Sequence, residues 1–335
     1  MRKSSYDFEI RKVRDEIIKR EAKIILIQLP EGLKLYGPKL AEVVENAGGL
    51  AIIHGDPCYG ACDVATVEAE RLGADLIIHY GHSEMMEKEV TPTLFIEAKM
   101  KGSIKIAVKK AIPLIKNWGK IGLVTTVQHI HKLDDARRVL LDAGKVIIIG
   151  DAGRLKYAGQ VIGCDYSNAK IVSAEVDVFL FVGGGRFHAL GVALTTAKPT
   201  IVADPYEKRA FRIEDGCEKV LKKRWATIHE AGKSKNFGIL IGLKTRQKRL
   251  DKALTLKSLL EKAGKKGTLI ALKEITPEAL MQFSTLDAFI NTACPRLALD
   301  NSRNFHKPLL NSNEALVILG KVTWEELCEK GWFEN

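Results

Sequence analysis

Short apolar runs alternate with amphipathic stretches along most of the chain. Runs such as residues 24–29 and 121–125 are almost continuously apolar, which is typical of parallel strands covered on both faces. Between the runs, apolar positions recur with helical spacing, and helices are expected over 38–47, 132–143 and 250–263. The pattern predicts an α/β fold with parallel sheets. The expected strands cover residues 24–29, 50–54, 75–80, 121–125, 145–149, 177–182, 237–241, 268–272 and 287–292.

The expected strands fall into three sets that repeat one motif. The third strand of each set opens with an aspartate, as in Asp75-Leu-Ile-Ile-His-Tyr-Gly81, Asp177-Val-Phe-Leu-Phe-Val-Gly183 and Asp287-Ala-Phe-Ile-Asn-Thr-Ala293. These aspartates are 102 and 110 residues apart. Buried parallel strands resemble one another, so convergence is the alternative, but the common register favours three similar α/β units of about 100 residues.

Polar, lysine-rich stretches at residues 99–103 and 222–236 interrupt the pattern of strands and helices. They divide the chain into a first unit over 1–103, a second over 104–222 and a third over 223–335. Near the end, Thr323-x-x-Glu326 has the spacing of a capping box, so a closing helix is expected within residues 322–332.

Composition is that of an ordinary globular protein. Of the 335 residues 46% are hydrophobic and 28% charged, which excludes a disordered chain. No apolar run approaches the roughly 20 residues of a membrane-spanning helix, and the first residues lack a signal-peptide core, so a cytoplasmic protein without a membrane partner is expected. The formal net charge of +11 favours an acidic partner. Lys/Arg clusters at 109–110, 222–224 and 244–252 are interpreted as solvated helix surface.

Each unit places at least one cysteine near the carboxyl end of an expected strand, the edge at which open parallel sheets bind ligands. These cysteines are Cys58 and Cys62 in the first unit, Cys164 in the second and Cys294 in the third. Three converging thiolates suit a [4Fe–4S] cluster with one open iron better than structural zinc, which is closed by four ligands. The alternative is that these cysteines are small buried residues.

A glycine-rich turn, Gly183-Gly-Gly-Arg186, follows an expected strand and precedes helix-like sequence. Backbone N–H groups of such a turn can approach an anionic ligand, and the Arg186 guanidinium can hold a carboxylate, with a structural salt bridge as the alternative. His79, His129 and His188 lie near strand ends and are interpreted as packing or supporting residues rather than metal ligands. Motifs of serine hydrolases, zinc proteases and RNA-recognition modules are absent, so a nucleic-acid partner is not expected.

Seven short motifs occur in an order that resembles one enzyme family. They are Gln28-x-Pro-Glu-Gly-Leu33, Tyr59-Gly-Ala-Cys62, Tyr80-Gly-His-Ser83, Gln128-His129, Gly163-Cys164, Gly185-Arg-Phe-His188 and Cys294-Pro-Arg296 with Asp300. The chain is similar to the 2-(3-amino-3-carboxypropyl)histidine synthases, which catalyse the first step of diphthamide biosynthesis, in their single-subunit archaeal form. The resemblance extends from about residue 20 to residue 320.

The resemblance implies three α/β domains in a pseudo-threefold arrangement, a homodimer, and a [4Fe–4S] cluster held by Cys62, Cys164 and Cys294. It implies that an external donor supplies an electron and that S-adenosylmethionine is cleaved in a noncanonical radical reaction that releases methylthioadenosine. The aminocarboxypropyl radical would add to C2 of a histidine imidazole of translation elongation factor 2. Cys58 departs from the family motif as an additional thiol four residues before Cys62.

Polar groups at the three domain edges are expected to bind S-adenosylmethionine. The candidates from loop position are Gln28, Gly183, Gly184, Gly185, Arg186 and Arg296. Two main alternatives stay open, and a sugar or nucleotide transferase with inert cysteines is a weaker third. One is a quinolinate-synthase-like [4Fe–4S] dehydratase, which also uses three α/β units with one cluster cysteine each. The other is a noncatalytic, translation-linked binding protein, which the basic charge permits and the lack of aromatic platforms disfavours.

Overall fold

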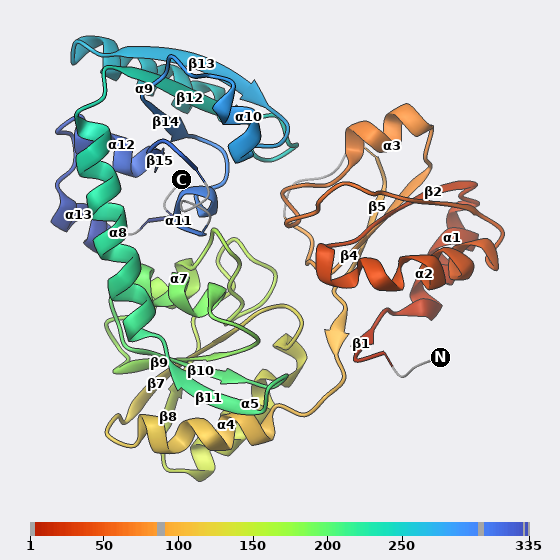
Figure 1. Ribbon diagram of the computed structural model, residues 1–335. Coiled ribbons are helices and arrows are strands. Elements are labelled where there is room, and N and C mark those ends of the chain that lie inside the picture. Colours follow the sequence, from red (N-terminus) through yellow and green to blue (C-terminus); the bar gives the residue numbers. More distant parts are fainter. Residues whose placement is uncertain (1–3, 86–90, 301–304, 331, 334–335) are drawn as a thin grey trace.

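Three separate sheets, each built around parallel strands, organise the chain (Figure 1). The computed structural model describes residues 4–85, 91–300, 305–330 and 332–333. The first sheet has the order β3(Leu50–Ile53), β2(Ile24–Gln28), β4(Leu76–Tyr80), β5(Thr93–Ile96). The second has the order β8(Val146–Ile148), β7(Lys120–Thr125), β9(Val178–Val182), β10(Thr200–Asp204), β11(Arg209–Arg212). The third has the order β13(Lys266–Leu272), β12(Asn236–Gly242), β14(Ala288–Asn291), β15(Leu309–Asn311).

The three sheets share one topology. In each, the second strand in sequence pairs with the first, the first with the third and the third with the fourth, and all these pairs are parallel. Only β11 adds an antiparallel edge strand to the second sheet, and β1(Tyr6–Asp7) pairs with β6(Lys99–Met100) in a small ribbon outside the three sheets, within the described residues. All nine expected strands are confirmed, as is the α/β fold with parallel sheets.

Helices connect and cover the strands, as βαβ crossovers require. The first unit holds α1(Ile10–Arg20), α2(Gly37–Glu45) and α3(Thr66–Leu72), and the second holds α4(Lys105–Ala111), α5(Leu133–Asp142), α6(Ser167–Ile171) and α7(Phe187–Thr196). The third holds α9(Leu250–Lys262), α10(Pro277–Met281), α11(Arg296–Asp300), α12(Ser312–Ile318) and α13(Trp324–Lys330). Short 3₁₀ turns cover Glu31–Tyr36, Ile112–Ile115 and Ile130–Lys132. Among the described helices, none combines the length and the apolar character that crossing a bilayer requires.

The repeated aspartates accept the same kind of backbone hydrogen bonds in each unit. The Asp75 carboxylate accepts hydrogen bonds from the backbone N–H groups of Lys23 and Ile24, at 2.8 and 2.9 Å, and so ties the start of β4 to the start of β2. Asp177 and Asp287 bind the starts of β7 and β12 in the same way. Hydrogen bonds from the backbone lower the pKa of all three carboxyl groups. The same aspartate hydrogen bonds occur at the same position in all three sheets. This supports the three similar units that the sequence predicts.

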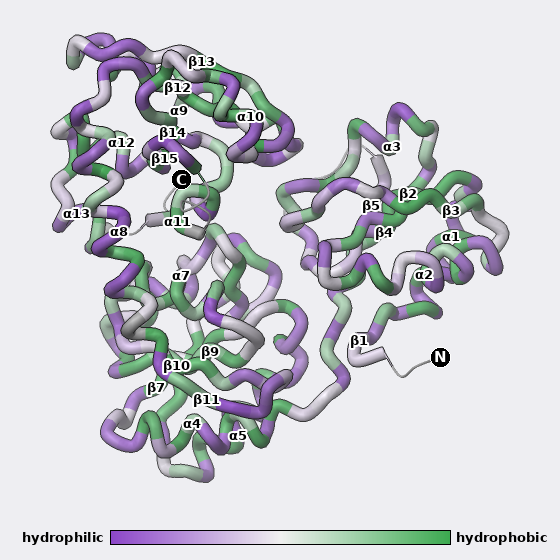
Figure 2. The backbone as a smooth tube through the Cα atoms, viewed as in Figure 1, coloured by the Kyte–Doolittle hydropathy of each residue, from purple (hydrophilic) through white to green (hydrophobic). Residues whose placement is uncertain are grey.

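The second and third units share a hydrophobic core, whereas the first unit has its own. The largest core cluster joins Phe179 and Phe181 of the second sheet to Phe237 and Ile239 of the third. The core around β2 and β4 contains residues of the first unit alone. In Figure 2 the central strands of the sheets are mainly hydrophobic.

A single helix, α8(Glu214–Gly232), runs along both the second and the third unit (Figure 1). The expected boundary after residue 222 therefore lies inside a helix, so the lysine-rich stretch does not interrupt the regular structure there. The interpretation of 222–224 as solvated surface is wrong for Arg224, which is fully buried. Its guanidinium forms a bidentate ion pair with Glu314 of α12, with two N···O distances of 2.6 Å. The expected closing helix is α13, and Thr323 and Glu326 form its capping box.

Candidate functional site

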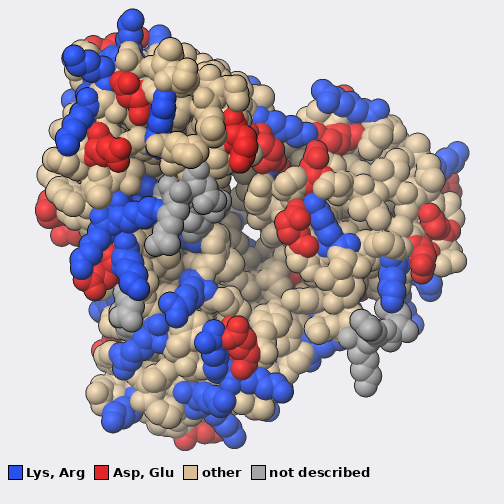
Figure 3. Space-filling model, viewed as in Figure 1, with Lys and Arg blue, Asp and Glu red and all other residues tan. Residues whose placement is uncertain are grey.

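A cavity of about 860 Å³ lies where the three units meet, and residues from all three line it. Figure 3 shows the three lobes around this hollow. The loops that reach the cavity follow the carboxyl ends of strands, as Gly81 follows β4, Gly184 follows β9 and Cys294 follows β14. This is the edge at which parallel sheets bind ligands, so the cavity is the candidate site.

Cys62, Cys164 and Cys294 all line this cavity, one from each unit. Burial, and then repulsion from the nearby Cys62 and Cys294 thiolates, raise the pKa of the Cys164 thiol to about 12. Burial also raises the pKa of Cys62. The three thiols are therefore close enough to interact, and holding them as thiolates requires a cation among them.

The spacing of these thiols suits a polynuclear group. Within the described part of the chain, the three sulfur atoms do not all lie within 4.8 Å of one another, as the ligands of one small ion would. A tetrahedral zinc ion holds thiolate sulfurs at about 2.3 Å, which would place them closer together than this. Three thiols from three units at one cavity are a donor set that an iron–sulfur cluster can use.

The loop that carries Cys62 is held by the third unit. The backbone N–H of Arg246 donates to the Cys62 carbonyl oxygen at 3.2 Å, and the Gln247 side-chain Nε2 donates to the Cys62 Sγ at 3.5 Å. In the third unit itself, the Asn291 side chain at the end of β14 donates to the Cys294 carbonyl oxygen at 2.6 Å. Hydrogen bonds from the third unit thus orient the Cys62 loop, and a bond within the third unit orients the Cys294 loop.

Lys244 is a site residue that the sequence interpretation missed. It was expected on solvated surface but is only 7% exposed, lines the cavity and follows the end of β12. Its Nζ lies 2.7 Å from both the Asp63 Oδ2 and the Glu274 Oε1. Burial opposes its charge, but the hydrogen bonds with these two carboxylates outweigh burial and raise the pKa of Lys244. Its place just beyond a parallel strand was the signal that could have identified it.

Two of the candidate S-adenosylmethionine ligands line the cavity, Gly184 and Arg296. Arg296 is only 5% exposed, and its guanidinium lies 3.5 Å from the centre of the Phe187 ring. One guanidinium nitrogen also donates to the Phe187 carbonyl oxygen at 3.2 Å. Arg296 is therefore a fixed cation at the cavity wall. The side chain of Asp300 lies outside the described residues.

The other glycine-turn candidates lie beside the cavity rather than on its described lining. The Gly185 backbone N–H donates to the Asp204 carboxylate at 3.1 Å, so the aspartate already occupies this donor. Arg186 is exposed and its guanidinium lies 5.1 Å from the centre of the Phe211 ring. Gly183 also lies off the described lining. A ligand held by these groups would have to reach out of the cavity.

Gln28 is buried at the end of β2, also off the described lining. Its Nε2 donates to the Asp63 carbonyl oxygen at 2.7 Å, and its Oε1 accepts from the Ala65 N–H at 3.1 Å. The same Oε1 lies 2.8 Å from the His79 Nδ1. All of these contacts are within the first unit, so Gln28 supports the loop that carries Cys62.

The fold and the cavity together define a class of α/β proteins with three like sheets and cysteines that face one shared ligand site. The family model described as "Putative diphthamide synthesis protein" matches residues 29–328. The chain therefore belongs to the diphthamide synthesis family.

Relatives of known name agree with this family. The 2-(3-amino-3-carboxypropyl)histidine synthase of Pyrococcus horikoshii is 39% identical over 301 residues, 89% of this chain and 86% of the relative. Subunit 1 of the Schizosaccharomyces pombe synthase is 32% identical over 336 residues, 96% of this chain and 76% of the relative. The crystal structure of Dph2 from Pyrococcus horikoshii with a 4Fe–4S cluster is similar with a TM-score of 0.88 and 37% identity, over 97% of this chain and 94% of that one. The resemblance is confirmed, and the chain is an aminocarboxypropyl transferase of diphthamide biosynthesis.

Proposed function

We propose that this enzyme transfers the 3-amino-3-carboxypropyl group of S-adenosylmethionine to C2 of a histidine imidazole of translation elongation factor 2. We further propose that Cys62, Cys164 and Cys294 hold a [4Fe–4S] cluster in the cavity. The observation that carries both proposals is the meeting of these three thiols, one from each unit, at a single cavity. The 4Fe–4S cluster of the similar Pyrococcus horikoshii structure supports the assignment of the group.

Three protein thiolates leave one iron of such a cluster without a protein ligand. When bound, the reduced cluster supplies the electron that breaks the sulfonium bond to the aminocarboxypropyl carbon, which leaves methylthioadenosine. The protein itself supplies binding and orientation. The fixed guanidinium of Arg296 can hold the carboxylate of the aminocarboxypropyl group, and Gly184 lets the Tyr206 ring pack against the backbone at the cavity wall.

After the aminocarboxypropyl radical adds to C2 of the target imidazole, the adduct must lose one electron, which the oxidised cluster would take back, and the C2 hydrogen as a proton. Two histidines of the cavity wall, His129 and His188, can accept it. Burial lowers the pKa of His129 to about 4 and that of His188 to about 3, and Arg296 adds to the effect at His188. Both imidazoles are therefore neutral at neutral pH and are weaker bases than an exposed histidine, so they can pass this proton on to water but do not hold it.

A product assay tests the proposal. Anaerobically prepared, cluster-loaded protein is mixed with S-adenosylmethionine and dithionite, and the released nucleoside is identified. We expect methylthioadenosine, and we expect its loss in Cys62→Ala, Cys164→Ala and Cys294→Ala. Cys328→Ala is the matched control because this partly buried thiol of α13 lies away from the cavity lining. Release of 5′-deoxyadenosine would overturn the proposed bond cleavage.

The same assay separates the other functions. A quinolinate-synthase-like dehydratase would hold the cluster without cleaving S-adenosylmethionine and would instead condense small acids. A noncatalytic binding protein would keep its function after loss of all three cysteines.

The homodimer, the external electron donor and the elongation-factor substrate stay predictions. Light scattering tests the homodimer, and assays with purified elongation factor 2 test the substrate.

A further inference from the structure

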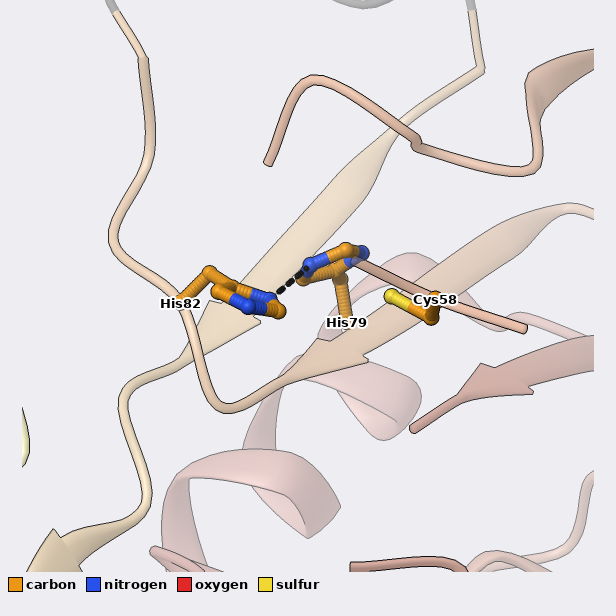
Figure 4. A group of neighbouring side chains, drawn as sticks. All are labelled: Cys58, His79 and His82. Carbon is orange, nitrogen blue, oxygen red and sulfur yellow. Dashed lines mark hydrogen bonds between the residues drawn. The ribbon is translucent and has the colours of Figure 1, made fainter. Parts of the chain in front are cut away.

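A second group of metal-binding side chains lies in the first unit. It consists of Cys58, His79 and His82, whose ligand atoms all lie within 4.8 Å of one another (Figure 4). Cys58 follows β3, His79 lies in β4, and His82 lies in the turn just after β4. The proposed cluster and the transfer reaction use none of these three residues. Cys58 and His79 are buried, with 3% and 0% exposure, while His82 lines the cavity.

The hydrogen bonds around Gln28 determine which nitrogen of His79 carries its proton. The Gln28 Nε2 donates to the Asp63 carbonyl oxygen and its Oε1 accepts from the Ala65 N–H, so the orientation of the amide is fixed. Because the Oε1 faces the His79 Nδ1 at 2.8 Å, that nitrogen must donate. The lone pair of His79 therefore lies on Nε2. An imidazole whose other nitrogen donates to a carbonyl oxygen is the usual arrangement of a metal ligand.

One of the other two ligand atoms, the His82 Nδ1, lies at this lone pair. The His82 Nδ1 is 2.9 Å from the His79 Nε2, and it donates to it in the absence of an ion. Figure 4 shows the Cys58 sulfur beside the His79 ring. Burial, and then the Asp63 carboxylate, raise the pKa of Cys58 to about 12, so the thiol stays protonated unless a cation neutralises it. Burial also keeps both imidazoles neutral, as metal ligation requires.

We propose that Cys58, His79 and His82 form a binding site for a divalent ion of the Zn²⁺ class, separate from the three cluster cysteines. Two imidazole nitrogens and one thiolate are a donor set that suits zinc. On binding, Cys58 releases its proton to solvent, and the proton on the His82 Nδ1 moves to Nε2 so that Nδ1 can coordinate. The fourth ligand is water or a group that enters from the cavity, which His82 lines.

Such an ion would join the loop after β3 to β4 and its following turn. Cys58 precedes Cys62 by four residues, and His79 and His82 belong to β4 and its following turn. An ion at this point would fix the loop that carries Cys62 to the central strands of the first sheet. The site therefore has a structural role beside the cavity, and it does not depend on the proposed function.

Cobalt binding tests this site, because a thiolate bound to Co²⁺ gives a charge-transfer absorption. The background is the full chain with Cys62→Ser, Cys164→Ser and Cys294→Ser, which removes the proposed cluster ligands. Titration with Co²⁺ is expected to give this absorption at one equivalent, and Zn²⁺ is expected to abolish it. Cys58→Ser and His82→Ala should each remove the absorption, whereas the matched control Cys328→Ser should keep it.

A supporting variant tests the role of Gln28. Gln28→Leu removes the acceptor that orients His79, and loss of such a partner weakens metal binding by about 10-fold to 100-fold. Circular dichroism shows that each variant is folded. If the triple background does not fold, the titration is made on wild-type protein expressed without cluster loading and compared with Cys58→Ser.

Two results would overturn the proposal. One is a folded background without thiolate-to-cobalt absorption, which would leave the His79–His82 contact as a hydrogen bond only. The other is an absorption that persists in Cys58→Ser, which would assign the bound ion to other thiols.

Discussion

At the scale of single residues, the charged groups that this fold buries are paired with partners distant in sequence. Arg224 meets Glu314 in the core of the third unit, and Lys244 meets Asp63 across the boundary between units. A buried charge without its partner is costly, so each pair fixes the position of two elements at once. The Glu314 carboxylate also accepts the Asn311 N–H and so completes the cap of α12.

Removal of Arg224 is therefore expected to destabilise the protein strongly. In Arg224→Met the Glu314 carboxylate stays fully buried without its cation, which costs about 3–5 kcal/mol of unfolding free energy. Urea denaturation measures the change. Lys222→Met is the matched control, because its pair with Glu218 on the same helix is exposed, and it should change stability by less than about 0.5 kcal/mol. Equal effects of the two substitutions would contradict the role of the buried pair.

Gln247 is expected to tune the proposed cluster. Its N–H donates to the Cys62 sulfur, and hydrogen bonds to ligating sulfurs stabilise the reduced, more negative state. Gln247→Leu should therefore lower the reduction potential, which a redox titration followed by electron paramagnetic resonance measures. Lys248→Met, an exposed neighbour, should leave the potential unchanged. An unchanged potential in Gln247→Leu would remove this residue from the ligand environment.

The three thiols at the cavity could be predicted from the sequence. Most of the residues around them could not. Cys62, Cys164 and Cys294 carry a chemical identity that a motif can reveal, and each follows a strand. Lys244 and Gln247 lie in a lysine-rich stretch that is indistinguishable from surface until the first unit packs against it. Their roles depend on partners more than 180 residues away, which local patterns do not contain.

At the scale of elements, the nine expected strands could be predicted because each is a short apolar run, and the third strand of each set also follows the repeated aspartate. The fourth strand of each sheet, such as β5 and β15, was not expected. β15 has only three residues, and β5 is partly exposed, so neither has an apolar run that distinguishes it from a loop. The position of each of these strands is determined by its pairing with the third strand of the sheet rather than by its own sequence pattern.

The hydrogen bonds of the repeated aspartates at the strand starts make a contribution to stability that is lost in acid. Backbone N–H donors lower the pKa of Asp287, so the folded state favours the charged carboxylate. Its stabilising effect is present above the ordinary aspartate pKa of about 3.9 and is lost as the pH falls through the lowered folded value. Asp287→Asn keeps an acceptor oxygen without the titration. We therefore expect it to lose less stability than wild type between about pH 5 and pH 3.

Urea midpoints at several pH values measure this difference. Asp251→Asn is a suitable control. This exposed aspartate lies in α9 of the same unit, away from the strand starts. An identical acid dependence of wild type and Asp287→Asn would show that the strand-start hydrogen bonds do not contribute to the effect.

At the scale of the whole molecule, the first unit is attached differently from the other two. The second and third units share one core and the helix α8, while side-chain hydrogen bonds and ion pairs hold the first unit. Gln128 and Gln160 bond to Gly81 and Ser83 at 2.6 and 2.8 Å, and Lys244 bonds to Asp63. The cavity therefore has one rigid wall made by two units and one wall held by polar contacts.

Loss of Lys244 should loosen that second wall. Lys244→Met leaves the Asp63 carboxylate without its cation, and burial already raises the pKa of this group. We expect faster amide hydrogen exchange in residues 58–66 and 243–247, with little change in the shared core around β9 and β12. Lys266→Met, at the exposed start of β13, is the control. Unchanged exchange in both segments would show that other contacts hold the first unit.

Cys62, Cys164 and Cys294 are 102 and 130 residues apart, so a group bound to all three closes two very long chain loops. Such a closure restricts the unfolded chain and favours the folded one, as any ligand of the native state does. Loss of the proposed cluster would therefore open both loops and weaken the attachment of the first unit, which would then depend on its polar contacts with the other two units. The lifetime of the protein in the presence of an added protease should then report whether the proposed cluster is bound.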